Sequence, residues 1–415
     1  MNERLYWPPP PRTIMTPGPV EADPRVLRAM SYPILGQFDP AFTAMMNETM
    51  ELLRRLFRTK NRQAYPVDGT SRAGLEAVLA GVVEPGDRVL VPICGRFGHL
   101  LHEIAERYGA EVIAIEREWG TAFDPEEIIG AIRKHRPKVV ALVHGETSTG
   151  RLQPMDGIGA ACRGHDALLV VDAVATIGGV PVVTDDWLAD AVVGGTQKCL
   201  SVPSGMAPLT YNERVERLIA GRRRIERGLR PAGAAEAERP FIRSNYLDLC
   251  QLQDYWSPER LNHHTEMTAM LYALREGVRI ALEEGLEARF RRHRLHERAL
   301  VAGLAAMGLT LFGDPSSKLP VVTCVNIPEG VDGDSVRAML LEAFGVEIAG
   351  SFGPLKGRIW RIGTMGYGCN MRNVLLTLGA LEAALVRHGV RVPAGGAVQA
   401  AMDVYEEEKA ALTGQ

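Results

Sequence analysis

The stretch DAVVGGTQKCLSVPSG, residues 190–205, joins a short apolar run to a turn rich in glycine, proline and hydroxyl side chains. An apolar run that ends in a polar turn is typical of a buried strand in a parallel sheet, where ligands gather at the carboxyl ends of the strands. Lys198 lies in this turn, although an unpaired ammonium is costly to bury. A solvated surface lysine is the simplest interpretation, so the surrounding chain decides whether Lys198 has a chemical role.

Similar apolar runs on both sides of this stretch predict an α/β fold. Strands are expected at residues 88–92, 111–115, 138–143, 167–173, 190–195 and 207–211, with helical patterns between them at 72–82, 99–109 and 124–135. Alternating strands and amphipathic helices indicate a mostly parallel sheet with helices on both faces.

The character of the chain changes after the charged segment 222–239. Long helical runs at 266–284 and 286–307 lead to a smaller α+β unit, with strands expected at 320–327 and 358–363 and helices around 333–344 and 371–388. We expect a proline-rich N-terminal arm over residues 1–25, a large domain over 26–275 and a small C-terminal domain over 276–415.

Composition excludes several classes of protein. A chain of 415 residues with 46% hydrophobic residues can form a large core, and its net charge of −3 gives no overall attraction to nucleic acid or anionic membranes. The apolar runs are too short to span a bilayer, and the N-terminus lacks the apolar core of a signal peptide. The six cysteines show no CxxC spacing. We therefore expect a cytoplasmic protein with reduced thiols and with neither nucleic-acid nor membrane partners.

Polar turns at the other expected strand ends supply candidate partners for Lys198. In VDGTSRAGLEAVLAG (67–81), a glycine and two hydroxyls open a helix whose free amides and dipole suit a phosphate, although a plain helix cap would look the same. In VVDAVATIGG (170–179), Asp172 ends an apolar strand and needs a cation, which a structural salt bridge would equally provide. A further polar turn, VHGETSTG (143–150), follows the strand between them.

A phosphate cradle, a buried carboxylate and a strand-end lysine are together what pyridoxal phosphate requires. Lys198 would form a Schiff base with the cofactor aldehyde, and Asp172 would keep the ring nitrogen protonated so that the ring can accept electrons. Gln197 beside the lysine would reach a phosphate oxygen. The sequence therefore predicts a pyridoxal 5'-phosphate enzyme.

Motifs across nearly the whole chain carry a family resemblance. They are TPGPVEADPRVL, FDPAF, DGTSRAGLEA, HGETSTGRLQP, VDAVATIGG, GGTQKCLSVPSG, LNHHTE and IWRIGTMGY, in this order. With them the sequence resembles the fold-type I pyridoxal phosphate enzymes of the alanine–glyoxylate aminotransferase group, and within it most closely the enzymes that use ureidoglycine in bacterial purine breakdown. The resemblance implies transfer of the amino group of (S)-ureidoglycine to glyoxylate, giving oxalurate and glycine. Alanine or serine with glyoxylate or pyruvate is the alternative.

The resemblance also implies roles for matching residues around the cofactor. Lys198 matches the catalytic Schiff-base lysine and Asp172 the acid at the ring nitrogen. The other implied cofactor-binding positions are Gln197, Thr70, Ser71 and Arg72 around the phosphate, Phe97 stacked on the ring where relatives usually have tryptophan, and Thr147 near the ring oxygen.

The resemblance also implies which residues contact the substrate and the cofactor of a partner subunit. Arg361 in IWRIG matches the arginine that binds the substrate carboxylate, a task suited to its bidentate guanidinium. Thr265 in LNHHTE matches a residue that reaches the phosphate from the other subunit. The resemblance therefore implies a homodimer with shared active sites, which bind a small amino donor and glyoxylate.

The chain departs from the alanine-using relatives at a position before the histidine pair. Those enzymes have a tyrosine there and this chain has Asn262, while Gln37 precedes FDPAF. We hypothesise that both amides hydrogen-bond a ureido group, because a site built for such bonds disfavours analogues that lack the group. Backbone contacts by both amides would explain them equally well.

Other signals are weaker. The pairs His99/His102, His263/His264 and His293/His296 lack the companions of a metal motif, so no metal is expected. The basic run 221–230 is interleaved with an acid and lacks aromatic residues, which favours a solvated face over nucleic-acid binding. A desulfurase would need a mobile catalytic cysteine in a C-terminal loop, and Cys369, the visible candidate, does not match that pattern. A non-catalytic regulator would not need Lys198, Asp172 and Arg361 together.

Overall fold

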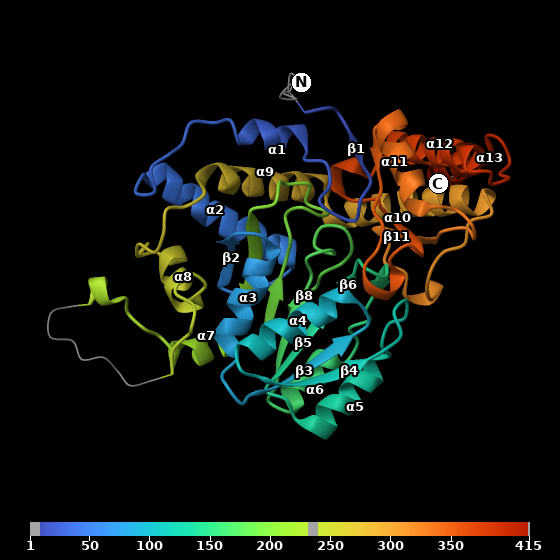
Figure 1. Ribbon diagram of the computed structural model, residues 1–415. Helices are drawn as coiled ribbons and strands as arrows, with labels where there is room; N and C mark the ends of the chain where they lie inside the picture. Colours follow the sequence, from blue (N-terminus) through green and yellow to red (C-terminus); the bar gives the residue numbers. More distant parts are fainter. Residues whose placement is uncertain (1–8, 231–239, 414–415) are drawn as a thin grey trace, which may run out of the picture.

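A computed structural model describes residues 9–230 and 240–413 and contains a seven-stranded sheet (Figure 1). The strand order is β2–β10–β9–β8–β5–β3–β4. The strands are β2 (Gln63–Asp68), β3 (Arg88–Ile93), β4 (Glu111–Glu116), β5 (Val139–Val143), β8 (Leu168–Asp172), β9 (Ala191–Val193) and β10 (Met206–Tyr211). Most residues of these strands are buried, because helices cover both faces of the sheet. The predicted α/β fold is confirmed.

Strand β10 is antiparallel to both of its neighbours, β2 and β9, while the other pairs are parallel. The turn 194–205 between β9 and β10 contains no helix, and a parallel crossover needs a longer connection. The chain therefore reverses direction here. The carboxyl ends of β2, β3, β5, β8 and β9 still meet along one edge of the sheet.

Helices connect these strands and extend the fold. Around the sheet they are α1 (Pro24–Ala29), α2 (Pro40–Phe57), α3 (Ser71–Val82), α4 (Arg96–Arg107), α5 (Pro125–His135), α6 (Ile158–Gly164), α7 (Glu213–Ala220), α8 (Leu249–Trp256) and α9 (Thr268–Glu284). Asp side chains cap several of them, as Asp124 does at the start of α5. Strand β2 and helices α1, α2, α6, α7 and α8 lie outside the segments expected from the sequence.

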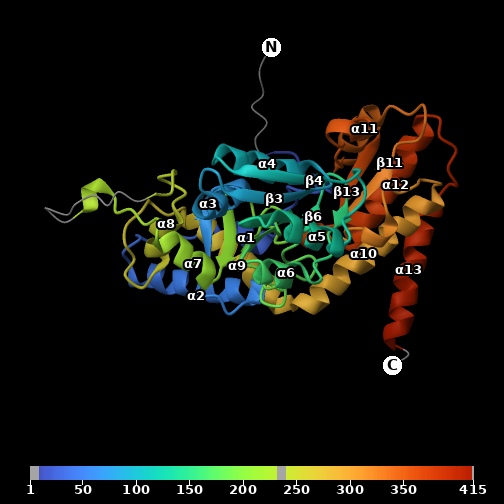
Figure 2. The same ribbon diagram turned by 90° about the horizontal axis from the view of Figure 1, so that it is seen from below.

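The C-terminal part packs beside the sheet (Figure 2). It comprises α10 (Leu286–Ala306), β11 (Val322–Asn326), α11 (Gly333–Phe344), β12 (Val346–Glu347), β13 (Ile359–Gly363), α12 (Met371–Arg387) and α13 (Gly396–Thr413). Strands β11 and β13 pair antiparallel, as expected for an α+β unit. Helix α13 lies outside the expected segments and packs along α10.

Hydrophobic side chains gather around separate centres. The largest cluster surrounds the sheet and runs from Val26 to Ala281, and another joins Met15 to side chains between Ala299 and Tyr405. Helix α9 lies in the sheet cluster on both sides of residue 275, the end expected for the large domain. We propose that the two domains meet at Gly285, between α9 and α10.

The N-terminal segment crosses from one part of the fold to the other. Residues 1–8 of the expected arm lie outside the described residues, but strand β1 (Thr13–Ile14) pairs in parallel with β12 of the C-terminal part. The chain then passes over the edge of the large sheet before α1. Among the helices of residues 9–230 and 240–413, none combines the length and apolar character that a membrane span requires.

Candidate active site

A cavity of about 250 Å³ lies at the edge where the strands of the large sheet end. Of the residues singled out in the sequence, it is lined by Thr70, Ser71, Arg72, Phe97, Thr147, Asp172, Gln197 and Lys198. Arg96, Leu75 and Leu100 complete its walls with the backbone around Gly145 and Val174. Five strand ends thus bring side chains from distant parts of the sequence into one small space.

Lys198 follows β9 and is buried beneath the N-terminal segment. Its Nζ donates a hydrogen bond to the carbonyl oxygen of Pro17. Burial, helped by the positive charge of Arg361, lowers the pKa of Lys198 to about 8. The amine therefore loses its proton far more readily than an exposed lysine, which favours reaction with a carbonyl group.

Asp172 ends β8 and is buried in the same cavity. Burial raises the pKa of Asp172 to about 7, against the hydrogen bond that its Oδ1 accepts from the Val174 amide at 2.9 Å and the attraction of Lys198. The carboxylate has no charged hydrogen-bond partner among the described residues. A protonated ring nitrogen placed in the cavity would supply the missing cation.

The start of α3 forms the polar end of the cavity. Thr70 precedes the first turn without a side-chain hydrogen bond to it, so the first amides of the helix remain available to a ligand. Ser71 Oγ donates to Gln197 Oε1 at 3.0 Å, which ties this turn to the lysine loop. Exposed amides at a helix start favour an anion, and the Thr70 and Gln197 side chains line the same space. The donor set therefore fits a phosphorylated aldehyde such as pyridoxal phosphate.

Glu146 is a buried acid of the site that sequence reasoning missed. Its carboxylate accepts hydrogen bonds from the amides of Phe97 at 2.9 Å and Ser148 at 3.0 Å, and thereby closes the start of α4. A Cβ at Gly95 would lie 2.4 Å from this carboxyl group, so the close approach requires glycine. Burial raises the pKa of Glu146, and the amide hydrogen bonds oppose that rise. The polar turn VHGETSTG was visible in the sequence, but its helix partner was not.

Arg361 lies on β13 and contacts the wall of the cavity without lining it. Its Nε donates to the Gly350 carbonyl at 2.7 Å and its Nη1 to the Thr147 carbonyl at 3.1 Å. The ring of Phe352 lies 4.5 Å from Arg361 and 4.2 Å from the guanidinium of Arg96. Burial lowers the pKa of Arg361 to about 10, and the group still carries its charge at neutral pH. Its Nη2 remains available for a carboxylate.

Gln37, Asn262 and Thr265 do not line this cavity. Asn262 and Thr265 are exposed, on the segment that precedes α9. Gln37 Nε2 donates to Asn262 Oδ1 at 2.8 Å, although 225 residues separate them. The structure thus joins the two amides to each other, and neither makes a backbone hydrogen bond among the described residues.

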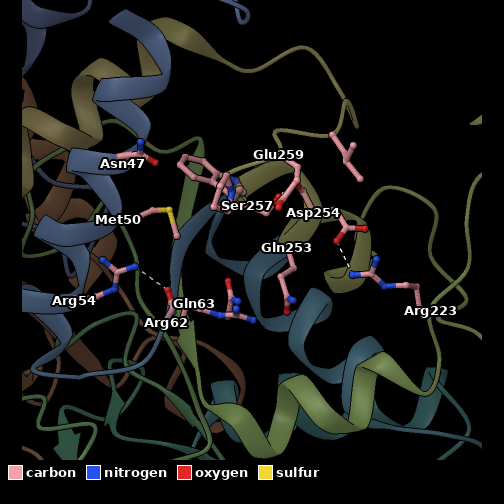
Figure 3. A pocket seen from close by; sticks show the side chains of 13 residues that line it. Asn47, Met50, Arg54, Arg62, Gln63, Arg223, Gln253, Asp254, Ser257 and Glu259 are labelled. Carbon is pink, nitrogen blue, oxygen red and sulfur yellow. Dashed lines mark hydrogen bonds and ion pairs between the residues drawn. The ribbon is translucent and has the colours of Figure 1, made fainter. Parts of the chain in front are cut away.

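A larger cavity of about 640 Å³ lies beside β2 and α8 (Figure 3). Two of its arginines are already engaged: Arg54 donates to the Arg62 backbone carbonyl at 2.9 Å, and Arg223 donates to Asp254 at 2.6 Å. It contains none of the residues singled out for chemistry. The smaller cavity around Lys198 is therefore the candidate active site.

Comparisons with known proteins agree with this chemistry. The chain is 68% identical over 400 residues to the (S)-ureidoglycine–glyoxylate transaminase of Bacillus subtilis, covering 96% of each sequence. A solved structure of ureidoglycine–glyoxylate aminotransferase from Bacillus subtilis matches 96% of this chain and 99% of that one with a TM-score of 0.91. The alanine–glyoxylate aminotransferase of Nostoc sp. is 40% identical, with a TM-score of 0.85 over 92% of this chain and 98% of that one. Residues 34–354 match the family "Aminotransferase class-V", and the chain therefore belongs to this family of pyridoxal phosphate transaminases.

Proposed function

We propose that this aminotransferase moves the amino group of (S)-ureidoglycine to glyoxylate and so gives oxalurate and glycine. The reaction would belong to the breakdown of purines through allantoin, in the cytoplasm. The hydrogen-bonded pair Gln37–Asn262 carries the proposal. The name of the 68% identical relative supports the same donor.

The amide pair is complementary to a ureido group. Because Gln37 Nε2 donates to Asn262 Oδ1, the carbonyl oxygen of Gln37 and the amide nitrogen of Asn262 remain available. The N–H groups of a ureido group can donate to the carbonyl oxygen of Gln37, and its carbonyl can accept from the amide nitrogen of Asn262. Alanine has neither, so it would leave both amides of the pair unpaired.

The position of the pair supports a homodimer with shared sites. Asn262 and Thr265 are exposed on one segment and lie outside the cavity around Lys198. Apolar side chains are exposed nearby, with Phe38 at 79%, Ile34 at 65% and Leu261 at 53%. We infer that a second subunit covers this surface and that each subunit presents its amide pair and Thr265 to the other's cavity.

The residues of the cavity divide the chemistry between them. Bound pyridoxal phosphate supplies an aldehyde for amines and a ring that withdraws electrons from the amino-acid Cα. Lys198 would hold the aldehyde, and its lowered pKa suits its Nζ to carry the proton of the amino-acid Cα. Asp172 would hold the charge of the ring nitrogen, and the start of α3 would bind the phosphate.

Arg361 orients the substrate. Its Nε and Nη1 are held by the carbonyls of Gly350 and Thr147, which aim the remaining edge of the guanidinium. Both ureidoglycine and glyoxylate carry a carboxylate that this edge can bind. One arginine therefore serves the donor and the acceptor in turn.

The donor is tested by the half-reaction. Purified yellow holoenzyme is titrated separately with freshly generated ureidoglycine, alanine and serine while the cofactor absorbance reports amine transfer. We expect ureidoglycine to act at concentrations about 100-fold lower than the other two, as for a site that hydrogen-bonds one substrate group, and glyoxylate to restore the original spectrum. Preference for alanine or serine would replace ureidoglycine with that donor and leave the aminotransferase assignment unchanged.

A variant ties the preference to the amide pair. Asn262→Tyr removes both hydrogen-bonding functions of the amide and should lower turnover with ureidoglycine far more than turnover with alanine. Lys198→Ala should abolish transfer from every donor. Equal losses with both donors in Asn262→Tyr would contradict the role of the pair.

A further inference from the structure

Three potential ligands converge beside the candidate active site. Asp68 ends β2, and His264 and Glu266 lie in the segment before α9. His264 Nε2 lies 3.1 Å from Asp68 Oδ2 and 3.8 Å from Glu266 Oε2, and one ligand atom from each residue lies within 4.8 Å of the others. Asp68 is 3% exposed and Glu266 5% exposed. Two carboxylates are thus buried side by side around one imidazole nitrogen.

The hydrogen bonds of His263 determine the tautomer of His264. They decide whether the His264 nitrogen that faces Asp68 and Glu266 carries a proton or a lone pair. His263 Nε2 lies 3.4 Å from the carbonyl oxygen of Asn245, which only accepts, so this nitrogen carries the proton. Neutral His263 then has an accepting Nδ1, which lies 2.7 Å from His264 Nδ1. His264 must donate there, and its Nε2 lone pair points toward Asp68 and Glu266. A positive species is needed between these three groups.

A proton alone does not complete the cluster. Carried on His264 Nε2, it would reach Asp68 but not Glu266, since 3.8 Å exceeds a hydrogen bond. Carried on Glu266, which faces Asp68, it would neutralise that acid but leave the lone pair of His264 Nε2 facing the Asp68 carboxylate. Both carboxylate oxygens of Glu266 are buried, and neither makes a hydrogen bond of good geometry among the described residues. Such an orphaned buried carboxylate is strongly unfavourable.

The adjacent arginine attracts Glu266 through its charge but forms no ion pair with it among the described residues. Arg260 directs its guanidinium to the side chain of Asn47 and, at 3.4 Å, to the carbonyl of Tyr255. Neither is an acid, and no ion pair joins Arg260 to Asp68 or Glu266 among the described residues. The buried hydroxyl of Tyr255 likewise has no hydrogen-bond partner, and its ring lies 4.8 Å from that of His264. Several buried polar atoms around the cluster are therefore unsatisfied.

We propose that Asp68, His264 and Glu266 bind a divalent transition-metal ion, for which Zn²⁺ is the best match. One imidazole nitrogen and two carboxylate oxygens are ligands that Zn²⁺ takes at about 2.0–2.2 Å, a length that brings all three within reach of one ion. His263 would hold the ring of His264 from the opposite nitrogen, as outer partners of metal-bound histidines do. The ion would satisfy Glu266, which no proton on His264 reaches.

Such an ion would connect the phosphate turn with the segment that precedes α9. Asp68 stands two residues before Thr70 at the start of the phosphate turn, and Thr265 lies between His264 and Glu266. The metal would fix both segments relative to each other. Its role is positional, and its presence does not depend on the proposed amino donor.

Metal content tests the site directly. Untagged full-length holoenzyme is equilibrated with excess ZnCl₂, desalted and analysed by inductively coupled plasma mass spectrometry. We expect about one Zn²⁺ per chain. Removal with dipicolinate should lower the thermal unfolding midpoint, and added Zn²⁺ should restore it. Co²⁺ exchanged into the wild-type protein should show d–d absorption bands that cofactor alone lacks.

Matched variants assign the ion to this cluster. Glu266→Gln keeps the side-chain volume and should lose the ion, whereas Asp190→Asn, which alters a buried acid paired with Arg214 elsewhere, should keep it. Wild-type protein that retains no Zn²⁺ and gives no Co²⁺ bands would overturn the proposal. The buried acids of the cluster would then be neutralised by protons alone. Equal Zn²⁺ retention in wild type and Glu266→Gln would place the ion elsewhere and overturn it as well.

Discussion

At Gly18 the N-terminal segment passes so close to Lys198 that a side chain has no room. A Cβ would lie 2.4–2.6 Å from the end of the lysine side chain, and the φ of +104° already disfavours other residues. The contact is invisible in the sequence, where Gly18 stands far from Lys198.

Gly18→Ala should therefore displace Lys198. We expect a loss of about 1–3 kcal/mol in unfolding free energy, from strain and overlap, and a fall in kcat of tenfold or more, on the order expected when a reacting group is misplaced. Thermal unfolding and steady-state kinetics measure the two effects.

Gly86 provides the control, because its φ of +87° is similar and a Cβ there would meet nothing within 4 Å. Gly86→Ala should cost only the backbone strain, about 1 kcal/mol, with kcat unchanged. If both variants kept full activity, the N-terminal segment would have no part in positioning Lys198.

Asp172 makes the stability of the cofactor-free protein depend on pH. Burial raises its pKa from the ordinary 3.8 to about 7, so the folded protein binds more protons than the unfolded chain between these values. Stability from this group is then present below pH 3.8 and is lost as the pH rises toward 7. Asp172→Asn removes this loss.

We compare the free energy of unfolding of the cofactor-free Asp172→Asn variant with that of the wild type. As the pH rises from 4 to 7, we expect the difference to change by as much as a few kcal/mol in favour of the variant, since one pKa unit corresponds to about 1.4 kcal/mol. Urea unfolding at several pH values measures the difference. A constant difference across this range would contradict the raised pKa.

Helix α3 joins the phosphate turn to the interior, and Arg222 closes its far end. The guanidinium of Arg222 is buried and donates to the carbonyls of Ala80 at 3.0 Å, Gly81 at 2.6 Å and Val83 at 3.1 Å. A cation at a helix C-terminus also compensates its dipole. The basic run 221–230 thus includes a structural arginine rather than only a solvated face.

Arg222→Met should destabilise the fold by about 2–4 kcal/mol, because three buried carbonyls lose their donor. Arg223→Met is the matched comparison: Arg223 is partly exposed and pairs with Asp254 at the surface, so about 1 kcal/mol or less is expected. Chemical denaturation of both proteins gives the values. Similar losses of unfolding free energy in the two variants would contradict the role of Arg222 at the end of α3.

For the whole molecule, the exposed apolar surface around Phe38 and Leu261 is where the homodimer is proposed to form. Phe38→Asp should raise the dimer dissociation constant about tenfold or more, as for a central interface residue, and lower activity where the subunits separate. Size-exclusion chromatography with light scattering across a dilution series measures the mass.

Leu412→Asp is the control for surface hydrophobicity. Leu412 is 70% exposed on α13, far along the chain from the proposed interface, and its replacement should leave the mass unchanged. A wild-type protein that is monomeric at all concentrations would contradict the shared active site itself.

The elements and the local chemistry of this protein could be predicted from the amino-acid pattern alone. Apolar runs predicted most strands of the sheet, and glycine and hydroxyl turns marked the strand ends at Thr70, Asp172 and Lys198. These signals are readable because burial and backbone conformation depend on neighbours a few residues away. Once parallel strands were predicted, their carboxyl ends had to share an edge, so these side chains could be grouped without coordinates.

Which distant groups meet became known from the folded chain. Glu146 closes α4, Pro17 holds Lys198, Gln37 binds Asn262, and Asp68 joins His264 across 196 residues. The fold also decided that β10 runs antiparallel. Such contacts depend on how whole elements pack and on the paths of connecting loops, and each residue alone has an ordinary local pattern. Specificity and the proposed metal site rest on these long-range contacts, so they became visible only in the folded chain.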